Sequence, residues 1–446
     1  MVDFGVDAQI SIDQNSDPAT LQQGILFSTI EALKKPPVVH KNAKVIRAED
    51  VAFRVVQNKK HLKIPKFGES DYAHENVEKR RKWVEETVGV NLKHLSGQPV
   101  LPQQWKGNIE NLIGVAQIPV GITGPILVHG QHAEGSFFVP MATTEGAIVT
   151  VYNLGMRIVS ESGGVKVRVK SNYLHVSPVF ITETIEESEV IVDWVKLHYK
   201  KIREIAESTT RHGKLLEIKP QLIERGLLLQ FIYSTGDAQG MNMINVATHK
   251  ACQFIEEAVK KHFYERSNYS AVKKISNHVT NSTFGKSVFC ESVVTREVLK
   301  KLRVSPEDMQ KLWHRGYLSS MRANMLGINC QAANGMAAIF LACGQDMADI
   351  SSSHVATSNC EVNGDGDLYV SLHIPSLLVG TVGGGTGNGT QKECLSIMEC
   401  AGSGMVDKFS EIIGATLLAG EITTGAALVT GNFVRGHAAL GRNKPE

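Results

Sequence analysis

Three ionisable side chains stand beside apolar segments of the sequence. Glu145 lies in Thr-Thr-Glu-Gly before an apolar run, Asp346 follows the run AAIFLACGQ, and His437 lies near a polar tail. Two carboxyl groups and a histidine that converge could hold one proton and deliver it to a leaving group. Taken singly, each is more often a helix cap, a helix-end charge or a surface histidine, so their spacing alone leaves the acid–base role open.

Two glycine-rich segments could receive an anion on bare backbone N–H groups. Residues 380–386 read GTVGGGT, without the third glycine of a GxGxxG motif, so tight packing and a nucleotide loop are both open. Residues 236–243 read GDAQGMNM between an expected strand and an expected helix, where an ordinary turn is the alternative. The sequence has no HExxH motif, EF-hand loop or spaced Cys/His set, so no metal site is predicted.

The composition narrows the functional class. The 446 residues carry 47 Lys and Arg against 45 Asp and Glu, which removes the electrostatic case for a nucleic-acid binder. No run of roughly 18 uninterrupted apolar residues predicts a membrane span. The polar first residues have no apolar export signal, and the seven cysteines contain no CxxC pair, so we expect a soluble cytoplasmic protein with reduced thiols.

The elements that must position these residues follow from local patterns. Helices are predicted over 71–87, after residue 146 through 154, over 194–207, 246–261 and 334–343, and from Pro306 behind the N-cap Ser305. Strands are predicted over 165–169 and 227–233, and Asp365-Gly366 predicts a hairpin turn. The alternation of strand and helix from about 178 to 275 is the pattern of a small α+β domain.

Six ordered motifs together resemble the 3-hydroxy-3-methylglutaryl-coenzyme A reductase family, nearest the class of eukaryotes, archaea and some bacteria. They are GNIENLIG with PVGITGP (107–125), PMATTEG (140–146), GDAQGMNM (236–243), ACGQD (342–346), GTVGGGT (380–386) and LAGE (418–421) followed by His437. The resemblance implies an α+β fold with three parts. These are a helical N-terminal region (1–106), a large coenzyme A thioester-binding domain (107–177 and 283–446) and an inserted ferredoxin-like NADPH-binding domain (178–275).

The resemblance also implies the roles of individual residues. Glu145 would be the general acid, Asp346 the carboxylate coupled to it, and His437 the proton donor to the coenzyme A thiolate. NADPH would be held by Thr210, Arg211, Asp237, Ala238, Gln239, Gly240, Met241, Asn242, Met243, Gly383, Gly384 and Gly385. Asn153, Arg157 and Asn334 match substrate-contacting positions. A homodimer or larger even assembly is expected, with the active site shared between subunits and residues 110–114 at the contact.

The family's catalytic lysine lies in an S-N-x-x-T-D-K-K loop. Read from Ser276-Asn277, that loop has Asn281 in place of the Asp, no Lys pair, and a shortened connection over 276–282. Lys286 is then the nearest replacement cation and His278 the second. Leu154 and Val176 also stand where the family has Arg.

Three functions are open at this point. The first hypothesis is an NADPH-dependent reductase of an acyl-coenzyme A or related acyl thioester, with a substrate altered from hydroxymethylglutaryl-CoA. The family's reaction reduces the thioester to an alcohol through a hemithioacetal and an aldehyde. The second is an ordinary hydroxymethylglutaryl-CoA reductase that makes mevalonate with Lys286 in the Lys role. The third is a catalytically weak paralogue that binds an acyl thioester or a nucleotide.

Overall fold

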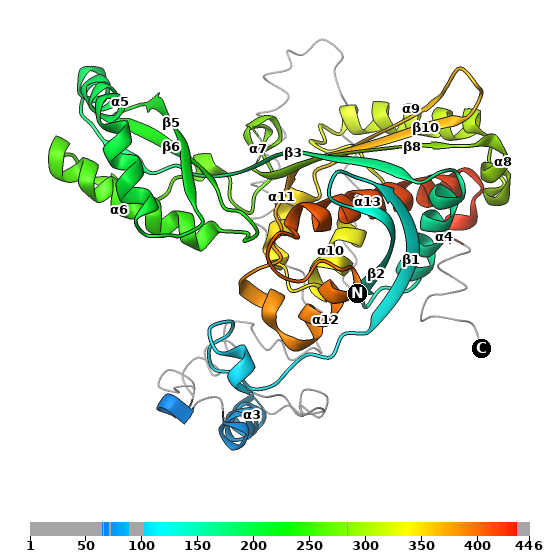
Figure 1. Ribbon diagram of the computed structural model, residues 1–446, viewed down its shortest axis with the longest axis horizontal. Helices are drawn as coiled ribbons and strands as arrows, with labels where there is room; N and C mark the ends of the chain where they lie inside the picture. Colours follow the sequence, from blue (N-terminus) through cyan, green and yellow to red (C-terminus); the bar gives the residue numbers. More distant parts are fainter. Residues whose placement is uncertain (1–64, 66, 71–72, 89–101, 283, 435–446) are drawn as a thin grey trace, which may run out of the picture. The chain divides into compact units, whose positions relative to one another are not determined.

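The computed structural model describes residues 65, 67–70, 73–88, 102–282 and 284–434 (Figure 1). The chain divides into two compact units, 1–64 and 65–446, and only the second contains described residues. His437 and most of the expected N-terminal region lie outside the described residues. Helix α3 (His74–Val88) confirms the helix predicted over 71–87.

Ten strands of the described residues form one sheet, whose central order is β7-β4-β6-β3-β8-β10-β9. Strand β1 pairs with β2 and β3, and β5 pairs with β6. The strands are β1 (Val120–His129), β2 (Glu134–Ala142), β3 (Val165–Val176), β4 (Val179–Ile181), β5 (Lys214–Ile223), β6 (Gly226–Ser234), β7 (Phe263–Tyr264), β8 (Gly285–Val294), β9 (Thr357–Val362) and β10 (Leu368–Leu377).

The predicted hairpin at Asp365-Gly366 joins β9 to β10. Gly366 has a φ of 80°, a conformation that side chains with a Cβ disfavour. The Asn363 Oδ1 accepts the backbone N–H groups of Asp365 and Asp367, and Leu368 then pairs with Val362. Turn residues that prefer this geometry therefore set the register of the pair.

A large hydrophobic core lies between the sheet and three helices, α4 (Ile148–Glu161), α10 (Ala332–Ala342) and α13 (Val406–Val429). Figure 1 shows α13 running beside α4 and α10. Among the described residues, α13 alone is long and apolar enough to cross a membrane, but 83% of its most apolar 18-residue window is buried inside the fold. Its composition is therefore that of a central core helix.

A second, small core lies where α5 (Ile185–Glu207) and α6 (Met241–Val259) pack on β3, β5 and β6. Thr184 caps α5 by accepting the backbone N–H of Glu187, so α5 begins earlier than predicted. Strand β3 contributes to both cores: Val165 and Val167 belong to the large one, Leu174 and Val176 to the small one. The mixed α+β architecture is as predicted.

The connection predicted as a shortened loop over 276–282 is a helix. Helix α7 (Asn277–Ser282) begins after Ser276, whose Oγ accepts the backbone N–H of Val279. Val279 is buried in the small core, which holds the helix in place. The connection is thus helical and not a loop, because Val279 packs into the small core. The remaining α-helices are α8 (Arg296–Leu299), α9 (Pro306–Arg322), α11 (Ile350–Ser353) and α12 (Gly389–Ile397).

Candidate active site

Glu145 lies at the entrance to helix α4, in a turn that the sequence makes tight. Its backbone N–H is accepted by the Thr143 Oγ1, and Ala147, the residue before α4, has a φ of 75°. A cavity of about 140 Å³ opens here, which we call the Glu145 cavity. Its wall includes Asn334, one of the predicted substrate-contacting positions, together with Cys330, Gln331, Thr424 and Phe433.

A buried carboxylate on α13 holds one wall of the Glu145 cavity. Glu421 is fully buried, and its carboxylate accepts the backbone N–H of Cys330 at 2.8 Å and of Gln331 at 2.9 Å. The Ser358 hydroxyl donates to it at 3.3 Å. Burial raises the pKa of Glu421, and these donors work against that rise by favouring the charged form. Sequence reading noted Glu421 only as part of LAGE and missed this positioning role.

Asp346 forms an ion pair with a lysine that sequence reading did not propose. The Nζ of Lys273 lies 2.6 Å from the Oδ2 of Asp346, and both side chains are about half exposed. The Asp346 Oδ1 accepts the backbone N–H of Ala348, which orients the carboxylate. We call this the Lys273–Asp346 pair. It places a cation next to a carboxylate at an accessible surface.

The lysine loop is therefore present, and the expectation of its loss was wrong. Residues 267–274 read SNYSAVKK, which follows S-N-x-x-T-D-K-K with Ala271 for Thr and Val272 for Asp. The chain contains Ser-Asn twice in this region, at 267–268 and at 276–277. Reading from the second copy displaced the motif past its lysines. Two departures remain, because Ala271 stands at the Thr position and Val272, which packs against the small core, stands at the acidic position.

Lys286, the predicted replacement, does not face either site. Its side chain is fully buried on β8 and donates to the Val379 carbonyl at 3.2 Å and to the Asn172 Oδ1 at 3.4 Å. Burial lowers the pKa of Lys286 to about 8. His278, the second candidate, shares a 3.0 Å hydrogen bond with Gln230 and packs beside Tyr269. Neither side chain lines the Glu145 cavity.

The two glycine-rich segments meet, although 140 residues separate them in the chain. The Asp237 carbonyl accepts the backbone N–H of Thr381 at 2.9 Å, and Ala238 pairs with Val382 as a parallel bridge. The Asp237 carboxylate accepts the backbone N–H of Val406. A Cβ on Gly380 would lie 2.6 Å from the Gln239 nitrogen, so this glycine permits close approach of the two segments. Tight packing thus explains Gly380.

Other parts of these segments leave room for a ligand. A Cβ added at Gly383 or Gly384 would meet nothing within 4 Å, and both residues have positive φ. Helix α6 begins at Met241 behind Gly240, which has no side chain to cap it, although the Gln239 Oε1 accepts the Met241 N–H. Arg211 is exposed. A glycine cradle, a helix N-terminus and a guanidinium together suit the phosphates of a dinucleotide.

The remaining predicted positions lie apart from the Glu145 cavity. On the exposed face of α4, the Asn153 Oδ1 accepts the backbone N–H of Gly124, and Arg157 lies 4.0 Å from Glu161. The Thr210 Oγ1 contacts the Met243 sulfur and accepts the backbone N–H groups of His212 and Gly213. The described residues contain no group of three or more His, Cys, Asp or Glu side chains that could hold a metal ion.

Glu145 and Asp346 are not brought together within one chain. The wall of the Glu145 cavity contains neither Lys273 nor Asp346. His437, the third predicted group, lies outside the described residues. The structure therefore presents two separate functional clusters, one with Glu145 and Asn334 and the other with Lys273 and Asp346.

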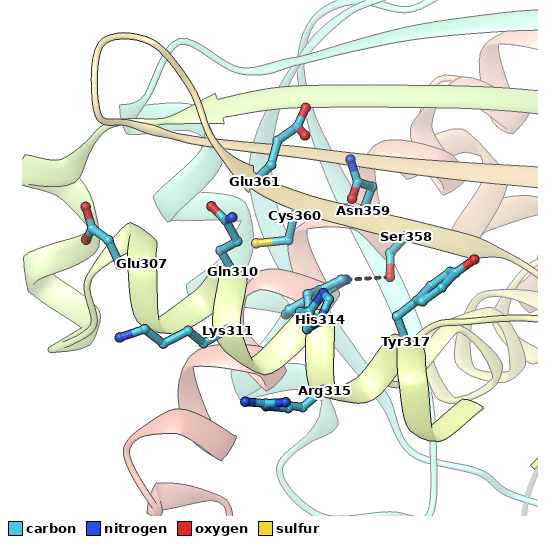
Figure 2. A pocket seen from close by; sticks show the side chains of 11 residues that line it. Glu307, Gln310, Lys311, His314, Arg315, Tyr317, Ser358, Asn359, Cys360 and Glu361 are labelled. Atoms are coloured by element: carbon cyan, nitrogen blue, oxygen red, sulfur yellow. Dashed lines mark hydrogen bonds between the residues drawn. The ribbon is translucent and has the colours of Figure 1, made fainter. Parts of the chain in front are cut away.

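A larger cavity, of about 690 Å³, lies elsewhere, between α9 and β9. Figure 2 shows its lining, with Lys311, His314 and Arg315 on the helix and Asn359 and Glu361 on the strand. Trp313 also lines the cavity and donates from its indole nitrogen to the Ser358 hydroxyl at 2.9 Å. None of the site residues predicted from the sequence lines this cavity.

Comparison with known proteins agrees with the motifs. The profile of the hydroxymethylglutaryl-coenzyme A reductase family matches residues 76–442. The 3-hydroxy-3-methylglutaryl-coenzyme A reductase of Methanocaldococcus jannaschii is 41% identical over 376 residues, which are 82% of this chain and 93% of that protein. The enzyme of the same name from Pyrococcus abyssi is 39% identical over 378 residues, covering 82% and 92%.

The fold has a counterpart among solved structures. The class II 3-hydroxy-3-methylglutaryl-CoA reductase of Streptococcus pneumoniae, solved bound to NADPH, superposes with a TM-score of 0.61 at 16% identity. The match covers 81% of this chain and all of that one. The expected fold class and the expectation of an oxidoreductase are confirmed. Six motifs in order, the profile match and the archaeal relatives lead to one conclusion: the chain belongs to the hydroxymethylglutaryl-coenzyme A reductase family.

Proposed function

We propose that this protein reduces hydroxymethylglutaryl-CoA to mevalonate and coenzyme A with NADPH, the ordinary reaction of the names its relatives carry. The observation that carries the proposal is the 2.6 Å contact between Lys273 and Asp346. It supplies the cation that the reaction needs at the developing oxyanion. The two carboxyl groups that the motifs assign to the reaction, Glu145 and Asp346, are also present.

The residues act on the thioester as follows. The Lys273 ammonium stabilises the oxygen of the thioester carbonyl as negative charge develops there. Glu145 donates a proton to that oxygen, and Asp346 holds Lys273 in place. His437, by motif, protonates the departing thiolate. When bound, NADPH would supply the two hydrides that reduction of the thioester to the alcohol requires, one from each of two molecules. The glycine cradle at 383–384 and the start of α6 would hold the dinucleotide.

The altered-substrate hypothesis loses most of its support. It rested on a missing lysine loop and on Leu154 and Val176 in place of Arg. The loop is present. Val176 is buried in the small core, and Leu154 packs against the large core, so neither forms part of the wall of the Glu145 cavity. The hypothesis of a catalytically weak paralogue rested on the shortened loop alone, so the same correction removes its support.

A second copy of the chain completes the active site in this proposal. Each chain offers a Glu145 cavity and a Lys273–Asp346 pair that do not touch. A symmetric dimer could place the pair of one subunit at the cavity of the other. Residues 110–114 remain the predicted contact segment, and the cytoplasm remains the predicted location.

The test is NADPH consumption by the full-length protein, followed as loss of absorbance, with hydroxymethylglutaryl-CoA and a panel of uncharged acyl-CoA thioesters. We expect turnover of hydroxymethylglutaryl-CoA with two NADPH consumed per mevalonate formed. Turnover of the uncharged acyl-CoA thioesters without turnover of hydroxymethylglutaryl-CoA would instead support the altered-substrate hypothesis. NADPH binding without turnover of any thioester would replace the proposal with a binding role.

A further inference from the structure

A third carboxyl group lies behind the Lys273–Asp346 pair. Asp349 precedes helix α11, three residues after Asp346, and it is 0% exposed. Its backbone N–H donates to the Asp346 carbonyl at 3.0 Å. The turn that orients Asp346 therefore also carries Asp349. Neither the motif analysis nor the proposed chemistry assigns Asp349 a task.

Asp349 links this turn to the second glycine-rich segment. The Gln239 side-chain amide donates to the Asp349 Oδ2 at 2.9 Å, and the same Gln239 side chain accepts the Met241 N–H at the start of α6. Gln239 thus connects the N-terminus of α6, an expected cofactor position, to the carboxyl group behind the catalytic ion pair. The Asp349 Oδ1 is buried and has no hydrogen-bond partner.

The charged groups around Asp349 can be named element by element. Burial raises the pKa of Asp349 most strongly, the Asp346 carboxylate raises it further, and Lys273 lowers it. Helix α10, packed against this turn, contains no titratable residue. Strand β10, packed against α11, contains Tyr369 and His373, which bond to Glu291 and Ser287. Burial and the neighbouring Asp346 carboxylate outweigh Lys273 and the Gln239 hydrogen bond and raise the pKa of Asp349 to about 7.

We propose that Asp349 is a positioning residue that ties the cofactor segment to the Lys273–Asp346 pair and that, by its proton, sets the charge of that pair. The inference rests on the proposed reductase activity. When Asp349 is protonated, the three groups carry no net charge and Lys273 can face a developing oxyanion. When Asp349 ionises, the cluster carries one negative charge next to a site that must receive an anionic cofactor and a negative transition state.

The sign of the pH effect follows. Raising the pH through about 7 ionises Asp349 in the wild type. The added charge should lower kcat and weaken NADPH binding, by roughly fivefold to tenfold for a unit charge at a partly solvated site. In Asp349→Asn, whose side chain has no charge, kcat and NADPH binding should not change through this pH range. Removing the Gln239 donor should move the transition to higher pH, because that donor favours the ionised form.

The experiment compares wild type, Asp349→Asn and Gln239→Leu across pH 6 to 9, with kcat, KM for NADPH and NADPH affinity by fluorescence. Asp365→Asn, an exposed aspartate in the β9–β10 turn, is the matched control. We expect the alkaline loss in wild type and Asp365→Asn, its absence in Asp349→Asn, and its displacement upward in Gln239→Leu. The same alkaline loss in Asp349→Asn would overturn the inference.

A second readout does not depend on turnover. Infrared difference spectra of the free protein should show a protonated carboxyl band that titrates near pH 7 in wild type. The band should be missing in Asp349→Asn and displaced in Gln239→Leu, so the inference stays testable even if Asp349→Asn fails to fold. No carboxyl titration between pH 6 and 8 in wild type would refute it. Lack of turnover with the band present would instead count against the proposed reductase function alone.

Discussion

Glu145 lies in a cavity walled by three helices of the large core, whereas Lys273 lies on a stretch between the small core and α7. The cavity wall is fixed from behind by Glu421, a buried carboxylate on α13. The Lys273–Asp346 pair is half exposed and held by turns and a single ion pair. The Glu145 cavity thus provides a fixed pocket, and the Lys273–Asp346 pair provides an accessible cation. Each lacks what the other has, and the proposed dimer would bring the two together.

The largest effect is expected when the positive charge of Lys273 is removed. Lys273→Ala should lower kcat by about 10²- to 10³-fold, the usual loss for one oxyanion-stabilising group. Lys301→Ala is the matched control, because Lys301 forms an ion pair of the same 2.6 Å length with Glu161. Steady-state kinetics on both variants gives the answer. Wild-type kcat in Lys273→Ala would remove Lys273 from the mechanism.

Mixing two inactive variants tests whether the regions belong to different subunits. Glu145→Gln and Lys273→Ala should each be nearly inactive. Random reassociation of the two makes heterodimers with one intact site, so activity should return to about a quarter of wild type if the site is shared between two chains. Activity is measured after denaturation and joint refolding, with each variant refolded alone as the control. No recovery would mean that both groups serve one site from the same chain.

Two buried glutamates on α13 test whether the wall of the Glu145 cavity contributes to substrate binding. Glu421→Gln should raise KM for the thioester and cost about 2–4 kcal/mol of stability, because an amide nitrogen would face backbone donors in the wall of the Glu145 cavity. Glu411 is equally buried and accepts the backbone N–H groups of Gln131, His132 and Ala133, away from that cavity. Glu411→Gln should lose comparable stability with KM unchanged. Denaturant unfolding and kinetics separate the two cases.

The smallest effect is expected at Lys286, the lysine buried on β8. Its folded pKa of about 8 lies below the unfolded value of 10.5, so the unfolded chain binds more protons between these pH values. Lys286 should therefore add to the unfolding free energy as the pH rises from 8 to 10.5, by at most about 1.4 kcal/mol per pH unit.

Lys286→Met should lose this contribution and keep its kcat. Urea unfolding at several pH values measures it, with the exposed Lys300→Met as the control. An unchanged pH slope in Lys286→Met would show that the ammonium is not buried in solution. A large drop in kcat would return Lys286 to the list of catalytic candidates.

Local signals in the sequence predicted the elements whose ends have their own chemistry. Ser305 caps α9 through the backbone N–H of Asp308, and Asp365-Gly366 turns β9 into β10. Helix α13 gave no such signal, because it is buried on nearly every side and so has no polar face to create a helical period. The longest helix of the described residues was missed for that reason.

The site was predictable where motifs are unambiguous and hidden where contacts are distant. Glu145 and Asn334 are 189 residues apart, yet the motifs assigned both and the structure places them at one cavity. Lys273 was missed because the Ser-Asn dipeptide occurs twice and the copy without the Lys pair was aligned to the motif, whereas the ion pair with Asp346 favours the first copy. The contacts of Glu421 and Asp349 could not be predicted, although Glu421 belongs to the LAGE motif, since their partners come from segments about 90 and 110 residues away.

Strand β3 is shared between the two hydrophobic cores, with Val165 and Val167 in one and Leu174 and Val176 in the other. Its pairing with β8 is irregular between Val169 and Ser171, at the crossing from one core to the other. Because β3 packs into both cores, unfolding of either core would remove packing contacts from the other. The two should therefore unfold together, as a single heat-absorption peak, and a substitution deep in either core should lower the melting temperature of the whole assembly.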